Sequence, residues 1–380
     1  MHCTQTLFRG LADDLPLLPW LHERIWPLEH AHDAASTHAS AELTFAELLR
    51  TGTTSVQTME SVRHAEVAAE VALQSGLTVI TGNCLMDVAS PQLPRGMATP
   101  ADEALRRTDE LRRAYDGRGL GRSRVQIAVS PRFVLSCSDG LARDAAAYAR
   151  QHALRVHTHA AEHPAEVAAV RARFGRDYVE VLHEQGLLGE RTGLAHCVHT
   201  SPRERELLAA TGTAVLHCPS TNLKLGSGIA PIADYRARGL RVAFGADGAP
   251  CNNRLSMPTE LRQAALLQSL AAGPGVFPAA AALWTATRGG ALALGLGDVG
   301  ALAPGRRADL LLWRLDDPFL GGDLASRLVY GADERHLEAV FCGGAEVVRR
   351  GELLGLDLAA LAARAATARD GVLRRAGLTR

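Results

Sequence analysis

Short β-rich segments alternate with longer helical segments over the first 246 residues, and this alternation limits the folds open to the chain. Strands separated by helices pair in parallel, through right-handed crossovers, into an α/β sheet covered by helices. Pro164 and Pro202 stand where two helices should begin, since a first turn tolerates proline. The pattern predicts seven strands, at residues 53–58, 77–81, 125–129, 155–158, 193–195, 214–217 and 242–246.

The expected strand number is one short of a closed (β/α)8 barrel, which needs eight parallel strands. The pattern of residues 1–29 predicts a loop and a helix rather than a buried strand, so we expect the chain to start just after strand one. Beyond residue 300 come β-rich pieces with glycine turns, at 310–313, 339–342 and 346–349, typical of a small satellite. We therefore predict a TIM-type α/β barrel over residues 1–300, β-sandwich satellite strands over 301–356 and a C-terminal helix over 357–380. Strand one and part of the satellite are expected to be missing.

The charge balance narrows the classes of partner. Lysine and arginine number 41, as do aspartate and glutamate, so the formal net charge is zero. A nucleic-acid or anionic-membrane binder normally carries a basic excess, and we expect neither partner. No apolar run approaches the ~18 residues of a membrane span, and the N-terminus lacks signal-peptide features. Seven cysteines without a CxxC pair indicate reduced thiols, so we expect a cytoplasmic protein acting on a small molecule.

Four polar side chains stand at the ends of expected strands: His159, His196, His217 and Asp247. The carboxyl ends of barrel strands meet on one face, where active sites are built. Three imidazoles and a carboxylate suit zinc or another divalent metal that accepts imidazole ligands. Any one of them alone is better interpreted as a hydrogen-bonded core or turn residue, but four in the same register indicate a metal site.

The densest group of candidates lies in RVHTHAAEHPAE, residues 155–166. Glu162 follows His159 by three residues, close enough to move a proton at a water on the metal, or else it is an ordinary first-turn acid of a helix. His157 shares the strand with His159, and we expect only one of the two to face the barrel axis. The segment 159–163 also matches the HxxEH pattern of some zinc proteases, which requires a continuous helix. We reject that interpretation because Pro164 begins a helix rather than interrupting one.

Longer motifs are spread over the whole chain: TLFRGLADDLPLLPWLHERIWPLE, PRFVLSCS, HTHAAE, LAHCVH, HCPSTNLKLGSGIAPI, GADGAPCNN and PGRRADLLL. Together they resemble the amidohydrolase superfamily. Within it they are similar to the aminohydrolases that include 5′-deoxyadenosine, methylthioadenosine/S-adenosylhomocysteine and guanine deaminases and the triazine hydrolases, and most of all to 5′-deoxyadenosine deaminase-like proteins. The resemblance implies a metal-dependent TIM barrel with a β-sandwich formed by the two chain ends.

The resemblance also implies a metal site. Family members carry an HxH pair of ligands at the end of strand one, and His2 matches the second histidine, so the first would fall just before Met1. His159 and Asp247 match two further ligands. Glu162 matches the proton shuttle, and His196 the imidazole that contacts the metal-bound water and the reacting ring. Zinc is the expected metal, with iron or another divalent ion as alternatives.

A second set of matches concerns the substrate. Glu29 matches an acid that holds ribose hydroxyls in the nucleoside branch. Arg132 stands where methylthioadenosine-type enzymes often have histidine and guanine deaminases have arginine, which leaves the choice of purine open. Phe133 is a candidate for stacking on a base, as are Trp20 and Trp26, and His217 is expected at the pocket.

The implied activity is hydrolytic deamination of an adenine nucleoside derivative through a metal-bound hydroxide, which Asp247 and His196 would orient. The enzyme would be a hydrolase acting on C–N bonds of a cyclic amidine, and a homo-oligomer. One alternative is a guanine-type or triazine aminohydrolase with the same machinery and a different pocket. Another is an N-terminally truncated, catalytically impaired barrel, because the first histidine of HxH is absent from the sequence.

Overall fold

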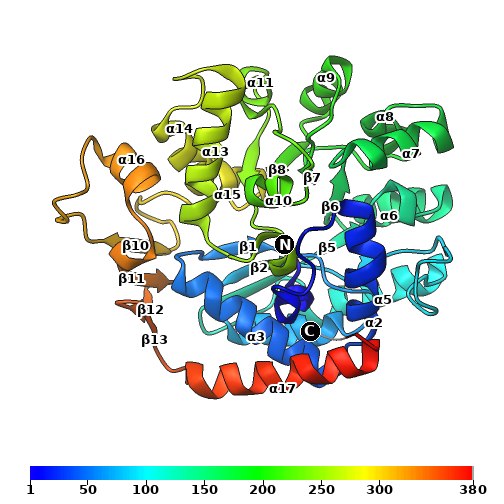
Figure 1. The fold of residues 1–380 in the computed structure, drawn as a ribbon, viewed down its shortest axis with the longest axis horizontal. Helices are drawn as coiled ribbons and strands as arrows, with labels where there is room; N and C mark the ends of the chain where they lie inside the picture. Colours follow the sequence, from blue (N-terminus) through cyan, green and yellow to red (C-terminus); the bar gives the residue numbers. More distant parts are fainter. Residues whose placement is uncertain (379–380) are drawn as a thin grey trace.

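Seven parallel strands form a strongly curled sheet at the centre of the computed structural model, which describes residues 1–378 (Figure 1). Every neighbouring pair in the order β1-β2-β5-β6-β7-β8-β9 is parallel, which confirms the seven predicted strands and their direction. The strands are β1 (Ser55–Gln57), β2 (Thr78–Thr81), β5 (Ser123–Pro131), β6 (Arg155–Ala160), β7 (Thr192–His196), β8 (Ala214–His217) and β9 (Val242–Phe244). Two short strands that the sequence did not indicate, β3 (Cys84–Leu85) and β4 (Gly119–Leu120), pair with the long β5.

The curled sheet is open between its two edge strands, because within residues 1–378 no strand pairs β1 with β9. The first residues of the chain run along the β1 edge. The amino group of Met1 donates to the carbonyl of Gln57 at 2.9 Å, and the amide of Met59 donates to the carbonyl of Met1 at 2.8 Å. These two bonds hold His2 beside the carboxyl end of β1, facing the end of β9.

Helices on the outside of the sheet follow the predicted strand–helix alternation. Pro164 and Pro202 occupy the first turns of α7 and α9 as expected, and Ser201 caps α9 in a capping box with Glu204. The helices along this part of the chain are α3 (Ala34–Arg50), α4 (Ala65–Gln74), α5 (Ala101–Tyr115), α6 (Asp139–Gln151), α7 (Pro164–Phe174), α8 (Tyr178–Glu184), α9 (Pro202–Thr211), α10 (Pro219–Lys224), α11 (Ile232–Ala237), α12 (Ala249–Asn252) and α13 (Met257–Ala272).

The N-terminal segment combines short helical turns with a loop over residues 9–16, in line with the loop and helix expected there. It comprises the 3₁₀ turn η1 (Cys3–Phe8), α1 (Leu17–Pro19), the π-helical turn η2 (Trp20–Ile25) and α2 (Trp26–His30). A π-helical turn widens the helix by one residue per turn and is frequent at functional sites. This segment lies across the carboxyl end of the sheet and buries Trp20, Ile25 and Trp26.

Side chains from residues 279–296 fill the interior of the curled sheet at the amino ends of its strands. Residues 279–293 form α14 (Ala279–Trp284), the π-helical turn η4 (Thr285–Gly289) and α15 (Gly290–Ala293). Ala293 packs with Leu216 and Ala243, and Leu296 packs with Ile80 and Ala128. The amino ends of the strands are thereby closed, which leaves the carboxyl ends for a site.

The satellite is a single antiparallel sheet in the order β10-β11-β12-β13. Three of its strands were predicted and the short β13 was not; a second sheet, which a sandwich requires, is not among residues 1–378. The strands are β10 (Leu310–Trp313), β11 (Leu337–Cys342), β12 (Ala345–Arg349) and β13 (Glu352–Leu353), with the short turns α16 (Leu324–Ser326), η5 (Arg327–Gly331) and η6 (Glu334–His336) before β11.

The predicted C-terminal helix is α17 (Leu358–Ala376), which lies along α3 (Figure 1); residues 379–380 of that prediction lie outside the described residues. Through residue 378, no helix is both long enough and apolar enough to span a lipid bilayer.

Candidate metal centre

Three strand ends carry the predicted site residues to one face of the sheet. His159 lies on β6, His196 is the last residue of β7, and Asp247 follows β9. His196 and Asp247 adopt left-handed backbone conformations, with φ of 70° and 56°. Such conformations cost a non-glycine residue free energy and tend to cluster at functional sites. Here they turn two polar side chains inward at the point where the strands end.

His2, His159 and Asp247 bring three potential ligand atoms within 4.8 Å of one another. The Nε2 atoms of His2 and His159 are 3.2 Å apart, and the Nε2 of His2 is 3.4 Å from Oδ1 of Asp247. The Nδ1 of His2 donates to the carbonyl of Met59 at 2.9 Å, and the Nδ1 of His159 donates to the carbonyl of Arg132 at 2.6 Å. With Nδ1 as the donor in each ring, both Nε2 atoms are the ring nitrogens that face the site.

This donor set fits a divalent metal. Two imidazole nitrogens and a carboxylate oxygen this close together need a proton or a metal ion between them, and metal-bound histidines typically donate their other ring N–H to a carbonyl, as here. Ligands about 2.0–2.1 Å from a tetrahedral zinc are about 3.4 Å from each other, close to the separations of 3.2 and 3.4 Å. Burial, with the charges of His2 and His196, holds the pKa of His159 well below its usual value, so the ring is neutral and able to ligate.

His157 corrects one expectation from the sequence. We expected only one of His157 and His159 to face the barrel axis, but their rings are stacked with centroids 6.2 Å apart. Residues two apart in a strand point to the same face, so the two imidazoles lie side by side. His157 is 3 % exposed and is not among the three potential ligands.

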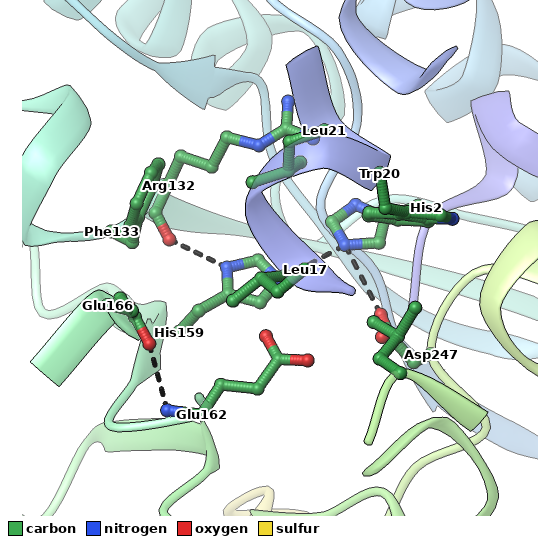
Figure 2. A pocket seen from close by; sticks show the side chains of 11 residues that line it. His2, Leu17, Trp20, Leu21, Arg132, Phe133, His159, Glu162, Glu166 and Asp247 are labelled. Atoms are coloured by element: carbon green, nitrogen blue, oxygen red, sulfur yellow. Dashed lines mark hydrogen bonds and ion pairs between the residues drawn. The ribbon is translucent and has the colours of Figure 1, made fainter. Parts of the chain in front are cut away.

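Glu162 projects toward the three ligand atoms from the turn between β6 and α7 (Figure 2). One of its oxygens, Oε2, lies 3.4 Å from the Nε2 of His196, and the other is buried without a partner among the described residues. Burial, together with the charges of Asp247 and Glu166, raises the pKa of Glu162 well above its usual value. A carboxyl group with a raised pKa is suited to giving and taking a proton during a reaction.

Glu166, which the sequence reasoning missed, fixes that turn. Its Oε2 accepts from the backbone amide of Glu162 at 2.9 Å, and its Oε1 accepts from the hydroxyl of Tyr178 at 2.6 Å. Glu166 lies in the first turn of α7, four residues after Glu162, and an acidic residue is too common in a first helical turn to have been singled out in advance.

Asp247 is the anionic group of the cluster. Burial alone would raise its pKa, but the imidazoles of His2, His196 and His159 hold the pKa well below the usual value. Its Oδ2 lies 4.0 Å from the Nε2 of His196, on the side away from His2. One carboxylate oxygen of Asp247 therefore faces His2, a potential metal ligand, and the other faces His196.

Glu29 and Arg132 form a buried ion pair at the edge of the site. The guanidinium Nη1 donates to Oε2 of Glu29 at 2.7 Å and Nη2 donates to Oε1 at 3.2 Å, while the side-chain amide of Gln5 also donates to Oε1 at 2.7 Å. Burial would raise the pKa of Glu29, but the charge of Arg132 holds it below its usual value. Both oxygens of the predicted ribose-binding acid are thus already engaged, and Gln5 was not foreseen.

The pocket above the potential ligands has apolar walls. Leu17, Trp20 and Leu21 come from the N-terminal helical segment, and Phe133 comes from the turn after β5 (Figure 2). Phe133 and Trp20 line the pocket as predicted, whereas Trp26 does not. Besides the three potential ligands, Arg132, Glu162 and Glu166 provide the polar part of the lining.

His217 is placed apart from the cluster. It ends β8, is fully buried, and lines no part of the pocket. Burial, with the charge of His196, lowers its pKa to about 3. Neither ring nitrogen has a partner within residues 1–378, so a pocket role for His217 stays a prediction.

Comparison with known proteins places this geometry in a family. The model of the amidohydrolase family matches residues 1–347. A 5-methylthioadenosine/S-adenosylhomocysteine deaminase of Desulforudis audaxviator is 36% identical over 362 residues, covering 94% of this chain and 81% of the relative. A 5′-deoxyadenosine deaminase of Methanothermobacter thermautotrophicus is 36% identical over 359 residues, with the same two coverages. A zinc-bound adenosine deaminase of Xanthomonas campestris superposes with a TM-score of 0.91 at 33% identity, over 98% of this chain and 84% of that one.

Proposed function

The chain belongs to the amidohydrolase family, and from that premise we propose that it is a metal-dependent hydrolase that deaminates an adenine nucleoside derivative such as 5′-deoxyadenosine. The observation that carries the proposal is the convergence of His2, His159 and Asp247 beside Glu162 and His196. The 36% identity to deaminases of such nucleosides supports the substrate class. We take the seven-stranded sheet to be a barrel of the TIM type, whose carboxyl face is the usual place for such a site.

His2, His159 and Asp247 would hold the metal, and zinc suits two imidazoles and a carboxylate. A divalent ion bound there lowers the pKa of water toward neutrality, which supplies a nucleophile in the cytoplasm, where we expect the protein to act. The pairing of each Nδ1–H with a backbone carbonyl fixes the two rings in the ligating orientation before a metal arrives.

Glu162 and His196 would handle the protons of the reaction. His196, with its Nε2 3.4 Å from Glu162, would orient the attacking water against the amino-bearing carbon of the ring. Glu162 would pass a proton to the adjacent ring nitrogen and then to the departing ammonia. The raised pKa of Glu162 favours this double role, because the carboxyl group holds its proton more tightly than an exposed glutamate does and so has one to donate.

Phe133 and Trp20 would enclose the base. Both are buried aromatic side chains of the pocket lining, and an aromatic ring face is a common contact for a purine. Glu29, expected to hold ribose hydroxyls, could do so only alongside Arg132, which already occupies both carboxylate oxygens.

That ion pair favours a second candidate function. A buried guanidinium in the pocket lining is a hydrogen-bond donor, and a donor at this place suits a ring that carries a carbonyl oxygen better than one that carries only an amino group. A guanine-type aminohydrolase is therefore the alternative, with the same metal, Glu162 and His196, and a different ring.

A substrate panel tests both candidates. Zinc-loaded protein is incubated with 5′-deoxyadenosine, 5′-methylthioadenosine, S-adenosylhomocysteine and guanine, and ammonia release is measured against a Glu162→Gln control. Release from the adenine nucleosides is expected. Release from guanine alone would replace the first candidate with the second, and release from none of them would overturn both.

A further inference from the structure

The motif HCPSTNLKL contains the short helix α10, whose residues carry no role in the function proposed above. α10 follows β8 and packs against α12 and α13. Two of its consecutive residues, Thr221 and Asn222, are fully or almost fully buried, at 0 and 1 % exposure. Polar side chains are seldom buried unless they are hydrogen-bonded, and the partners of these two lead directly to the site.

Asn222 contacts His196. The Nδ1–H of His196 donates to Oδ1 of Asn222 at 2.9 Å, because an amide oxygen can only accept. With Nδ1 held as the donor, Nε2 is the nitrogen that faces the site, 3.4 Å from Glu162 and 4.0 Å from Asp247. The other tautomer would set the lone pair of Nδ1 against the amide oxygen of Asn222 in a buried place, which is unfavourable. Asn222 thus selects which nitrogen of His196 faces the site.

Thr221 reaches Asp247 through a cysteine. The hydroxyl of Thr221 donates to Sγ of Cys251 at 3.4 Å, and Sγ lies 3.2 Å from Oδ2 of Asp247 and 3.0 Å from the carbonyl of Gly248. With the sulfur accepting from Thr221, its own proton points to these oxygens. The contact ties down Oδ2 and leaves Oδ1 toward His2, the side of the potential ligands.

The buried carboxyl group of Glu260 fixes the start of α10 relative to the loop that follows β9 and contains Asp247, here called the Asp247 loop. Glu260 on α13 accepts from the backbone amide of Ser220 at 3.1 Å and from the side-chain amide of Asn252 at 2.8 Å. The same amide of Asn252 donates to the carbonyl of Ala246 at 2.7 Å, one residue before Asp247. The start of α10 and the start of the Asp247 loop are therefore fixed to one group.

We propose that α10 is the positioning element of the site: Asn222 sets the tautomer of His196, and Thr221 sets the orientation of the Asp247 carboxylate through the thiol of Cys251. This inference rests on the proposed function for its catalytic consequence, but the positions of the two side chains do not depend on any activity. Asn222, Thr221 and Cys251 are positioning residues, since none of them needs to touch the substrate.

The role proposed for Asn222, which is the first half of the proposal, is tested on metal-free protein by ¹⁵N NMR of the histidine rings. The signals of His196 are identified as those that disappear in His196→Asn. The wild type is expected to show Nδ1–H at His196, and Asn222→Leu, of similar size, to show the Nε2–H tautomer as well. Asn222→Asp keeps the acceptor oxygen and should restore the wild-type pattern. An unchanged His196 spectrum in Asn222→Leu would overturn this half.

Activity gives a second readout for Asn222. With an accepted substrate, Asn222→Leu should lower kcat by about 10- to 100-fold with little change in KM, and Asn222→Asp should recover most of the loss. Equal kcat in Asn222→Leu and the wild type would contradict the proposal. If no substrate is deaminated by the wild type, the proposed function fails while the NMR result still decides the tautomer.

The role proposed for Thr221 and Cys251 in orienting Asp247, which is the second half of the proposal, is tested by measuring zinc affinity in competition with a chelator. Cys251→Ala should weaken zinc binding by about 10- to 100-fold, Cys251→Ser should stay close to the wild type, and Thr221→Val should shift affinity in the same direction by less. Cys342→Ala, which removes another fully buried thiol on the satellite sheet, is the control for folding and should leave affinity unchanged. Wild-type affinity in Cys251→Ala would overturn this half. If Cys251→Ala does not fold, Thr221→Val decides the same question.

Discussion

The Nε2 atoms of His2 and His159 lie 3.2 Å apart, and the Nδ1 atom of each ring donates a hydrogen bond to a backbone carbonyl. Two ring nitrogens at this distance need a proton or a metal ion between them, and Asp247 adds a negative charge 3.4 Å from one of them. His2 lies just before the first 3₁₀ turn of the chain, and His159 lies on β6 in the middle of the sheet. Their meeting places a site for a divalent metal at the open edge of the sheet.

Zinc should therefore stabilise the folded protein. An ion present at about 1,000 times its Kd adds about 4 kcal/mol to the free energy of unfolding. We expect zinc to raise the Tm of the wild type but not of His159→Ala, measured by differential scanning calorimetry. His157→Gln, which alters the neighbouring ring of the same strand, is the matched control and should keep the response. An equal zinc response in His159→Ala would contradict the ligand assignment.

Glu162→Gln should separate proton transfer from metal binding. The substitution keeps the size of the side chain but removes its ability to exchange a proton, so kcat should fall by about 10²- to 10⁴-fold. Zinc stoichiometry and Tm should stay near those of the wild type, because Glu162 is not one of the three potential ligands. A variant with wild-type kcat would show that Glu162 is an ordinary acid of the turn.

The Glu29–Arg132 pair should matter for stability as well as for the substrate. Removing one partner leaves a buried charge uncompensated, so Glu29→Leu should lower the free energy of unfolding by about 3–5 kcal/mol in urea titrations. The double variant Glu29→Leu/Arg132→Met removes both charges and should lose much less. A double variant that is less stable than Glu29→Leu would mean that the pair acts through packing rather than charge.

Glu260 should make stability depend on pH. Burial raises its pKa to about 7, against about 4.3 for an exposed glutamate. The folded state then binds the proton of Glu260 more tightly than the unfolded state does. The stabilisation that this protonated group provides is complete below the unfolded pKa and is lost as the pH rises through about 7. The loss is about 3–4 kcal/mol. Urea titrations between pH 4.5 and 8 should show this decline relative to Glu260→Gln; parallel curves for the two proteins would contradict it.

The strands and their polar ends could be predicted from the sequence because both are local patterns. Alternating β-rich and helical segments located all seven parallel strands, and their last residues supplied His159, His196 and Asp247. The resemblance to a family supplied His2, which has no local signal. The shared face of His157 and His159 was mispredicted, although the two-residue period of a strand requires it.

The contacts that hold the site together could not be predicted in this way. Arg132 meets Glu29 across 103 residues, and Cys251 meets Thr221 across 30, through the packing of loops that follow different strands. Asn222 and Glu166 are single polar residues in helical segments, where most such residues face solvent. Their roles become visible only when burial and partners are known.

Titration of zinc into metal-free protein, with ammonia release from 5′-deoxyadenosine as the readout, tests the central claim most directly. The three potential ligands form one site per chain, so the rate should rise in proportion to added zinc and level off at one equivalent. Undiminished ammonia release from the metal-free protein, or none at one equivalent and above, would contradict the account.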